Sequence, residues 1–396
     1  MITAEENVRL TQTGPGTFMG ELLRRYWWPI AATVDLDDDP VRPVRLLSEN
    51  LVLFRDEKGK LGLVAERCAH RGISLAYGIP QENGLRCAYH GWTYDSDGHV
   101  VDMPFEPACL PLKITAYAAE ELGGLIWAYM GPEPRPLLPR LELLVRDDLA
   151  RGITMRPLPC NWVQCNDNSI DPVHFEHLHG YAADWWNRKH GINRRVQTAR
   201  HLKIAFDVFE YGIYKRRLVE GEPDDADDWT VGHPFLFPHT LVQGVGDSYG
   251  YQIRVPVDDT HTLHVRYRGS PVRPGEEIPA KVPVRHLELP YDELGRVEWS
   301  DIPLQDEAAW VAQGPLSDRT GEHLVTSDKG VILYHNMLIE NAEKVQRGED
   351  PMFVIRDEAK NTPYVHVERE RDSAKMITRG IEPNTLDARQ AVTAKG

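Results

Sequence analysis

Basic charge, long apolar runs and cysteine are all scarce in this chain of 396 residues. Lys and Arg number 45 against 60 Asp and Glu, a formal net charge of −15, so the basic surface that binds nucleic acid is not expected. No apolar run approaches the roughly 18 residues of a membrane helix. Residues 1–6 lack the basic and apolar regions of an export signal, so we expect a cytoplasmic protein with no membrane partner.

The five cysteines are too few for a disulfide framework. We expect Cys109, Cys160 and Cys165 to be reduced and partly buried, and Cys160 and Cys165, which lack the spacing of a metal pair, to be packing residues. The sequence has no Walker loop, no G-x-G-x-x-G element and no ferredoxin-type run of four cysteines. If the protein is a redox enzyme, its electrons must therefore come from a separate reductase.

The other two cysteines each stand beside a histidine, in C-A-H at Cys68–His70 and in C-A-Y-H at Cys87–His90. A zinc finger places its two Cys together and then its two His together. The Cys-His, Cys-His order here instead gives each loop one ligand of each kind, which suits a Rieske [2Fe–2S] centre with two Cys on one iron and two His on the other. With the flanking Arg71-Gly72 and Gly91-Trp92, the pattern resembles the Rieske signature. Zinc binding is the alternative, and visible colour would separate the two.

The first part of the chain is expected to be an all-β domain carrying this centre on two loop tips. Residues 1–30 resemble a helical lead-in, with an apolar stripe that includes Trp27 and Trp28 and ends at Pro29. Turn signals at Asn83-Gly84 and Asp97-Gly98 separate short strands. The predicted strands are Val44–Leu47, Leu51–Arg55, Leu61–Glu66 and Gly124–Tyr129.

A proline-rich connector at 132–139 sets the expected domain boundary at about 131–150. We expect a first domain over 1–150, with its core at about 40–130, and a second over 151–396. The second half mixes strand-like runs with helical patterns, so the expected class is α+β. Its predicted strands are Lys203–Phe209, Gly250–Pro256 and Thr262–Tyr267, and its predicted helices are Glu307–Gln313, Gly330–Arg347 and part of Asn161–Gly180.

A second constellation follows at Asp171, His174, His177 and His179. Two His and one carboxylate on one face form the open non-haem iron site that leaves positions for O₂ and substrate. On a regular helix His174 shares a face with His177, and it meets His179 only if the helix bends or ends. Spacing alone therefore leaves the ligand pair open.

With these residues in view, nearly the whole chain resembles the oxygenase (alpha) subunit of Rieske non-haem iron aromatic ring-hydroxylating oxygenases. The branch is that of phthalate 4,5-dioxygenase and the aromatic-acid O-demethylases. The matching elements are L-T-Q-T-G-P-G-T from Leu10, R-R-Y-W from Arg24, the Rieske motif, and D-x-x-H-x-x-x-x-H from Asp171. The resemblance implies a bacterial protein whose second domain has a helix-grip (START-like) fold of antiparallel sheet and helices.

The resemblance also assigns roles. It implies Cys68, His70, Cys87 and His90 as cluster ligands and His174, His179 and a distant Asp as ligands of mononuclear Fe(II). The best match for that Asp is Asp306, with Asp301 and Glu307 as rivals. His177 is left as a supporting or surface residue, and Asn168 and Asp171 are implied to be functional without binding metal. In the implied homotrimer, or dimer of trimers, Asp171 would bridge His174 and a cluster His of the neighbouring subunit, His90 in preference to His70.

The expected function is that of a terminal oxygenase, which uses O₂ and NAD(P)H electrons from a flavin/[2Fe–2S] reductase to hydroxylate or dihydroxylate an aromatic acid. O-demethylation of a methoxylated aromatic acid by the same chemistry is the first alternative, and a Rieske electron carrier without oxygenase activity is the second. An acid substrate calls for cationic side chains. Lys215-Arg216-Arg217 lies in a suitable region, although a solvated strand face would explain it equally. Phe235, Phe237, Trp185 and Trp186 could line an apolar pocket, but aromatic stripes of this kind more often belong to the core.

Overall fold

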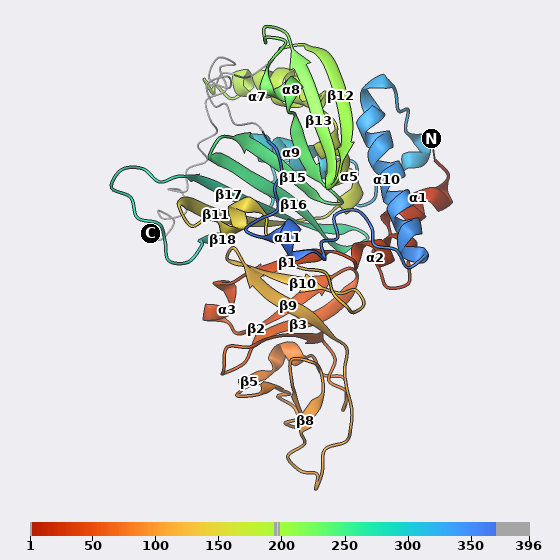
Figure 1. Cartoon of the computed structure of the whole chain (residues 1–396), viewed down its shortest axis with the longest axis vertical. Coiled ribbons are helices and arrows are strands. Elements are labelled where there is room, and N and C mark those ends of the chain that lie inside the picture. Colours follow the sequence, from red (N-terminus) through yellow and green to blue (C-terminus); the bar gives the residue numbers. More distant parts are fainter. Residues whose placement is uncertain (1, 194–195, 197–198, 370–396) are drawn as a thin grey trace.

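The computed structural model describes residues 2–193, 196 and 199–369. Figure 1 shows two parts, with β1 to β10 in the lower half and a large curved sheet flanked by helices in the upper half. The predicted α+β class is confirmed. Among the described residues, no helix is both long and apolar enough to cross a membrane.

The lower half contains an antiparallel six-stranded sheet in the order β1-β10-β9-β4-β3-β2. The strands predicted from alternation and turn signals are confirmed within it. Gly59, in the turn between Arg55 and Leu61, has a φ of 85° that glycine adopts without strain. The strands are β1 (Trp27–Ala32), β2 (Val41–Leu46), β3 (Glu49–Arg55), β4 (Leu61–Ala65), β9 (Ala116–Leu122) and β10 (Leu125–Tyr129).

A small four-stranded sheet, in the order β5-β6-β7-β8, forms the lower tip of the molecule in Figure 1. Strands this short are stable only over a hydrophobic base. Here Val52, Phe54 and Val64 of the larger sheet supply that base, together with Leu85 and Tyr94 of the tip. The strands are β5 (Ile79–Gln81), β6 (Gly84–Arg86), β7 (Thr93–Tyr94) and β8 (Val100–Asp102), and η1 (Leu75–Tyr77) precedes them.

The upper half is built on an eight-stranded sheet in the order β12-β13-β14-β15-β16-β17-β11-β18. Its neighbouring strands are antiparallel except for the β11–β18 pair, and the three predicted strands lie within β12, β16 and β17. The strands are β11 (Leu149–Leu158), β12 (His201–Phe209), β13 (Gly212–Val219), β14 (His233–Leu236), β15 (Thr240–Val245), β16 (Ser248–Asp258), β17 (His261–Pro271) and β18 (Val284–His286).

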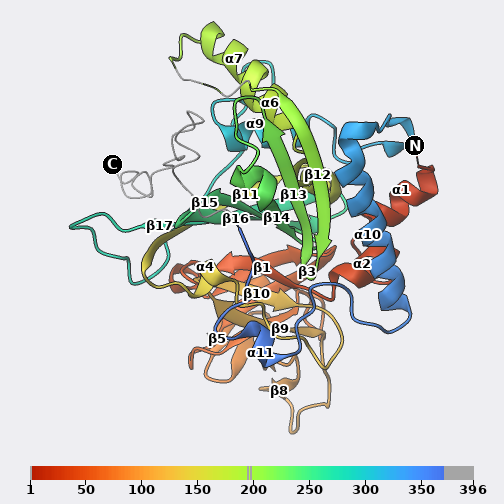
Figure 2. The same ribbon diagram turned by 45° about the horizontal axis from the view of Figure 1, so that its top comes forward.

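Three helices, α5 (Trp162–Ile170), α9 (Ile302–Val311) and α10 (Lys329–Gln346), pack beside this sheet. Figure 2 shows the smaller helices α6 and α7 above it. The remaining helices are α1 (Ala4–Thr11), α2 (Phe18–Leu23), α3 (Asp35–Asp38), α4 (Glu142–Val145), α6 (His174–Glu176), the π-helix η2 (His177–Ala182), α7 (Ala183–Lys189), α8 (Asp227–Thr230), η3 (Arg319–Gly321), η4 (Thr326–Asp328) and α11 (Glu358–Asn361).

The N-terminal lead-in is only partly helical. Trp27 and Trp28 belong to β1, where they pair with Tyr129 and Ala128, so the prediction of one helical stripe through them was wrong. Aromatic residues favour strands, and Pro29 is tolerated there because β1 is an edge strand with an irregularity next to that proline. The stripe of five apolar residues between Leu22 and Trp28, which Arg24-Arg25 interrupts, could not distinguish a helix from a strand.

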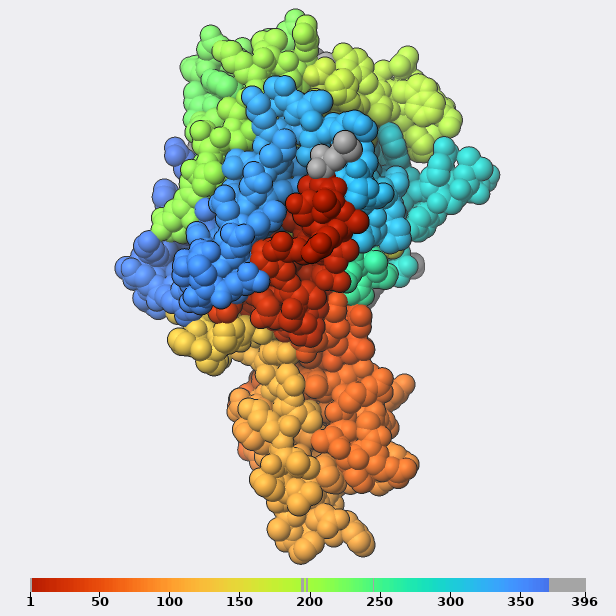
Figure 3. All heavy atoms as spheres, turned by 90° about the vertical axis from the view of Figure 1, so that its right-hand side faces the viewer, coloured from red at the N-terminus to blue at the C-terminus, as the bar shows by residue number. Residues whose placement is uncertain are grey.

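Helices α1 and α2 lie against the upper half of the molecule. Figure 3 shows the red N-terminal residues alongside the blue α10. Asn7 donates a hydrogen bond to the Ser317 carbonyl, and Asn161 donates one to the Thr11 carbonyl. One continuous hydrophobic core also joins Trp28 of β1 to Tyr334 of α10. The division at about 131–150 stays a prediction, although no strand of one half pairs with a sheet of the other among the described residues.

Helix α9 begins five residues before its predicted start at Glu307. Asp301 caps it by accepting a hydrogen bond from the Leu304 amide at 2.9 Å, and Pro303 fits its first turn. Asp306 and Glu307 therefore both lie inside a helix. Successive helical residues point about 100° apart, so these two carboxylates face different surroundings.

The three cysteines outside the Rieske motif are unpaired. Cys160 and Cys165 are buried with their sulfurs 3.6 Å apart, as packing residues should be. Cys109 is exposed, so the expectation that it is partly buried was wrong. It lies in the irregular segment between β8 and β9, in which residues 104–113 are all exposed.

Candidate metal centres and substrate pocket

The two loops that carry the Cys-His pairs have the same backbone structure. The Cys68 amide donates to the Ile73 carbonyl at 3.0 Å, and the Cys87 amide donates to the Trp92 carbonyl at 2.7 Å. In each loop a glycine four residues after the cysteine then donates back to the cysteine carbonyl. These glycines, Gly72 and Gly91, have φ values of 72° and 79°, where any other residue would be strained.

The thiols are buried and the imidazoles are exposed at the tip. Cys68 and Cys87 are each 3% exposed, and the rings of His70 and His90 face each other with centroids 4.5 Å apart. Trp92 stacks on His70, and the Tyr94 hydroxyl lies 3.1 Å from the Cys68 sulfur. Burial is the main cause that raises the pKa of the Cys87 thiol, opposed by the amides of Tyr89 and His90. Two soft and two imidazole donors on facing loops fit a Rieske cluster.

The helix that carries the second constellation changes type between its two predicted ligands. α6 ends at Glu176, and the chain continues as the π-helix η2, in which hydrogen bonds span five residues instead of four. The wider turn brings His174 and His179, five residues apart, onto one face with ring centroids 5.2 Å apart. His177 is exposed and stacks on Tyr181 instead. The π-helix thus places His179, and not His177, beside His174, while the choice of ligand pair stays a prediction.

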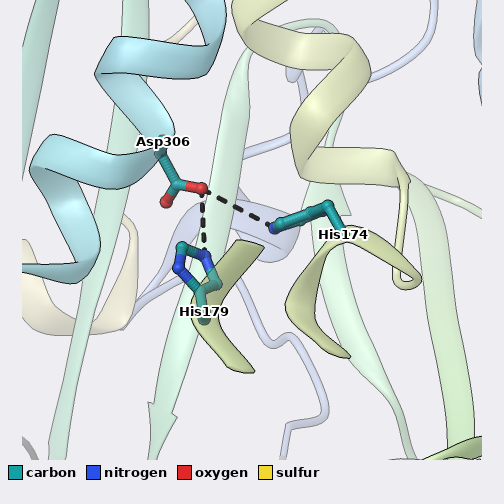
Figure 4. A group of neighbouring side chains, drawn as sticks. All are labelled: His174, His179 and Asp306. Carbon is teal, nitrogen blue, oxygen red and sulfur yellow. Dashed lines mark ion pairs between the residues drawn. The ribbon is translucent and has the colours of Figure 1, made fainter. Parts of the chain in front are cut away.

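Asp306 completes the group from α9. Its Oδ1 lies 3.1 Å from Nε2 of His179 and 3.7 Å from Nε2 of His174, as Figure 4 shows. One candidate ligand atom from each residue falls within 4.8 Å of the others. Two imidazoles and one carboxylate form the donor set of an open non-haem iron site.

The electrostatics of this group suit a cation. Burial would raise the pKa of Asp306, but the charge and hydrogen bond of His179, with His174, lower it to about 2. Burial would lower the pKa of His179, and the nearby Asp306 carboxylate raises it instead. For His174 burial prevails, and its pKa is lowered. An anionic carboxylate and two imidazoles are thus held together, and a metal ion would replace the proton on His179.

The two rivals of Asp306 have other roles. Asp301 caps α9. Glu307 is fully buried and accepts hydrogen bonds from Arg156 and from Nδ1 of His264, the latter at 2.8 Å. Burial, partly offset by Glu307, lowers the pKa of His264 to about 4. The contacts of Glu307 with Arg156 and His264 fix α9 to β11 and β17. With Glu307 directed to the sheet, Asp306 is turned toward the histidines.

Three polar side chains support the group. Asp171 accepts hydrogen bonds from the Val173 and His174 amides at 2.7 and 3.1 Å, and its Oδ2 lies 3.4 Å from Nδ1 of His174. Asn168 donates to Asp306 at 3.4 Å. Gln305, which no sequence pattern singles out, places its Oε1 2.8 Å from Nδ1 of His179. Its only sequence signal is its place next to Asp306.

A pocket with a volume of about 60 Å³ opens beside these residues. Lys215 and Arg217 line it from β13, because residues two apart in a strand share a face. Arg216 faces the other way and pairs with Asp207. Arg254 contributes a third cation from β16, which the sequence analysis did not identify.

The predicted aromatic residues do not line this pocket. Phe235 and Phe237 are fully buried against Tyr334 in the core, whereas Trp185 is exposed and Trp186 packs on His190 and Trp299. Phe235 and Phe237 therefore belong to the core, which is the more frequent place for such aromatic residues, because hydrophobicity alone does not separate core from pocket walls. The apolar part of the lining comes from Phe175, Leu241 and Ile302.

A pair of facing Cys-His loops and a buried two-His, one-carboxylate group together define a protein with a Rieske centre and a non-haem metal centre. Residues 26–117 match the Rieske [2Fe–2S] domain. The chain is 39% identical to the 5,5'-dehydrodivanillate O-demethylase oxygenase subunit of Sphingobium sp. (strain NBRC 103272 / SYK-6), an alignment that covers 100% of this chain and 92% of that protein. It is 32% identical to the phthalate 4,5-dioxygenase oxygenase subunit of Pseudomonas putida, over 88% of each.

The fold is similar to the terminal oxygenase of carbazole 1,9a-dioxygenase from Novosphingobium sp. KA1, with a TM-score of 0.63 and 20% identity over 87% of this chain and 99% of that one. The chain therefore belongs to the oxygenase (alpha) subunits of the Rieske non-haem iron oxygenases, as its sequence predicted. It is an oxidoreductase of that family, which uses a Rieske [2Fe–2S] cluster and mononuclear iron.

Proposed function

We propose that this oxygenase hydroxylates an aromatic carboxylic acid, and the observation that carries the proposal is the cationic pocket beside His174, His179 and Asp306. Lys215 and Arg254 are 7% and 1% exposed. Among the described residues neither forms a salt bridge: Lys215 donates to the Asp171 carbonyl, and Arg254 donates to Gln252. Buried cations without an anionic partner are costly, and a substrate carboxylate would supply that partner.

Arg217 is positioned to bind the carboxylate directly. Asp228 accepts the hydrogen bond of its Nε at 2.9 Å, and its guanidinium lies over the Phe175 ring at 4.2 Å. Both contacts fix the side chain. They leave the two terminal nitrogens of the guanidinium to donate hydrogen bonds to the two oxygens of a substrate carboxylate. The apolar Phe175, Leu241 and Ile302 would contact the aromatic ring.

We propose that His174, His179 and Asp306 hold Fe(II), and that Cys68, His70, Cys87 and His90 hold the cluster. A cluster held there would supply single electrons, and Fe(II) held by His174, His179 and Asp306 would supply open positions for O₂. Asn168 would orient the Asp306 carboxylate, and Asp171 would hold the His174 ring. The roles of all these residues are inferences from donor type and placement.

Electron supply involves two further proposals. The chain has no flavin or nicotinamide motif, and a separate NAD(P)H-dependent flavin/[2Fe–2S] reductase would reduce it, which suits a bacterial cytoplasmic location. The loop tip and the two-His group lie in opposite halves of the chain in Figure 1. A homotrimer in which one subunit's exposed His90 reaches the Asp171 of the next would shorten the path.

O-demethylation is the second candidate, favoured by the full-length similarity to an oxygenase subunit named as an O-demethylase. Here the methyl carbon of a methoxy group would be hydroxylated, and the hemiacetal would split into a phenol and formaldehyde. One O₂, two electrons and two protons balance that step by forming one water. Formaldehyde release separates this reaction from ring hydroxylation.

The test is oxygen uptake by the cluster-loaded, Fe(II)-loaded protein with a reductase and a panel of aromatic acids, each paired with its methyl ester. We expect uptake and oxygenated product with an acid and little with its ester. Arg217→Met should raise KM for that acid by about tenfold or more, whereas Arg216→Met, on the opposite face of β13, should leave it unchanged. Equal turnover of acid and ester, or equal effects of the two substitutions, would contradict the proposal.

A further inference from the structure

Gln305 links the backbone before α9 to one of the two imidazoles. Its side-chain amide donates to the carbonyl of Trp299 through Nε2 at 3.3 Å, and its Oε1 lies 2.8 Å from Nδ1 of His179. Gln305 and His179 are 5% and 6% exposed, so water does not compete for these bonds. A buried amide with both ends bonded holds one orientation.

This orientation determines the tautomer of His179. A backbone carbonyl can only accept a hydrogen bond, so Nε2 of the amide must face Trp299 and Oε1 must face the histidine. The amide oxygen also only accepts, so Nδ1 of His179 must carry a proton. In the neutral ring the lone pair then lies on Nε2, the atom that faces Asp306 at 3.1 Å.

We propose that Gln305 is a positioning residue for the mononuclear metal. The Trp299 carbonyl orients the Gln305 amide, and that amide orients the His179 imidazole so that its Nε2 lone pair points toward the ion. This inference rests on the proposed iron ligands. Groups that hydrogen-bond the outer nitrogen of a metal-bound histidine fix its ring and tautomer.

Gln305 makes the two imidazoles unequal. His174 has the Asp171 carboxylate behind its Nδ1 at 3.4 Å, whereas His179 has a neutral amide at 2.8 Å. A carboxylate increases the basicity of an imidazole more than an amide does. Gln305 therefore holds His179 firmly and adds no further negative charge next to Asp306.

The test measures Fe(II) binding to cluster-loaded protein without substrate or reductase, by anaerobic competition with an Fe(II) chelator. Gln305→Leu should raise the Fe(II) dissociation constant by about 10- to 100-fold, since the acceptor is lost. Gln305→Glu keeps the acceptor and should bind Fe(II) at least as tightly as the wild type. Gln313→Leu, on an exposed residue two positions beyond the last residue of α9, is the control and should change nothing.

The electron paramagnetic resonance spectrum of the nitric oxide adduct of the iron gives a second readout, because its rhombicity reports on the ligands. Gln305→Leu and Gln305→Glu should both change it, and Gln313→Leu should not. The proposal is overturned if Gln305→Leu binds Fe(II) within about threefold of the wild type with the same spectrum. If Gln305→Leu does not fold, an unchanged spectrum of the nitric oxide adduct in Gln305→Glu overturns the proposal instead.

One further variant separates this inference from the site on which it rests. His179→Ala should abolish tight Fe(II) binding. Wild-type binding in that variant would mean that the ligand assignment is wrong, whatever Gln305 does. Since no measurement here uses a substrate, a wrong substrate class would leave all of these outcomes unaffected.

Discussion

The two candidate metal centres of this chain are built in opposite ways. The Cys-His loops are close in sequence, share one backbone pattern and expose their imidazoles at the tip of a small sheet. The two-His, one-carboxylate group is buried, depends on a local π-helix, and takes its carboxylate from a helix far along the chain. The first arrangement suits a centre that exchanges electrons with a partner, and the second suits one that must control access of water and substrate.

The difference also concerns how each centre is supported. The tip rests on its own small core beneath Cys68 and Cys87, whereas the buried group rests on the large core and on the Glu307 ion pair. Each centre should therefore tolerate loss of the other. The three predictions that follow test this independence, the link between the centres, and the pocket that only the second centre has.

The largest expected effect is that of His179→Ala on the buried centre alone. Iron should fall from about three to about two per two acid-labile sulfides, and turnover should fall by on the order of a thousandfold or more. The visible spectrum of the cluster should not change. Metal analysis and absorbance of the anaerobically purified protein measure both.

His177→Ala is the control for this change, since His177 lies two residues away in the same π-helix but is exposed. It should keep the iron content and most of the turnover. A joint loss of iron and cluster colour in His179→Ala would mean that the two centres are not independent.

A smaller effect, on the link between the centres, is expected for Asp171→Asn. The amide oxygen can still accept from the Val173 amide, but the carboxylate behind His174 is lost. Both metals should remain, while turnover with the reductase should fall by about 10- to 100-fold. Single-turnover measurements with a pre-reduced cluster would locate the loss in electron transfer between the centres.

Asp357→Asn is a control for the backbone hydrogen bonds that Asp171 accepts. Asp357 accepts a hydrogen bond from the backbone amide of Ala359 at 2.9 Å. Asp171 likewise accepts from the amide two residues after it, but Asp357 caps the small helix α11, away from the metal ligands. Near-normal activity in Asp171→Asn would refute the bridging role and leave the two centres without a shared residue.

The smallest expected effect is a pH dependence of substrate binding at the pocket. Burial, with the like charge of Arg217, lowers the pKa of Lys215 to about 8. The ammonium is therefore present below that pH and is lost as the pH rises through it. KM for an aromatic acid should be flat at pH 7 and rise by up to about tenfold toward pH 9.

Lys215→Arg should remove this rise, because a guanidinium stays charged throughout that range. The methyl ester of the acid should show no such dependence in either protein. Bound iron would lower the pKa of Lys215 further. The increase of KM would then begin at a lower pH, and KM would still increase with pH. A flat profile in the wild type would remove Lys215 from substrate recognition.

Many of the strands and the types of the candidate ligands could be predicted from the sequence, because the patterns that indicate them are local. The strands around the Rieske motif follow from alternation and turn residues, and the ligand types follow from spacing. The errors came where local signals are ambiguous. Trp27 and Trp28 suited helix and strand equally, and the helix of Asp306 begins at a capping signal that an apolar pattern alone does not show.

The sequence by itself determined the kinds of metal donors, the α+β class and, through resemblance, the family. Only the tertiary structure decided that a π-helix brings His179 and not His177 to His174, that Asp306 faces them while Glu307 faces the sheet, and that Gln305 and Arg254 belong to the site. These depend on packing between segments distant in the chain. Spacing along one segment specifies which side chains share a face, but not which other segment that face will meet.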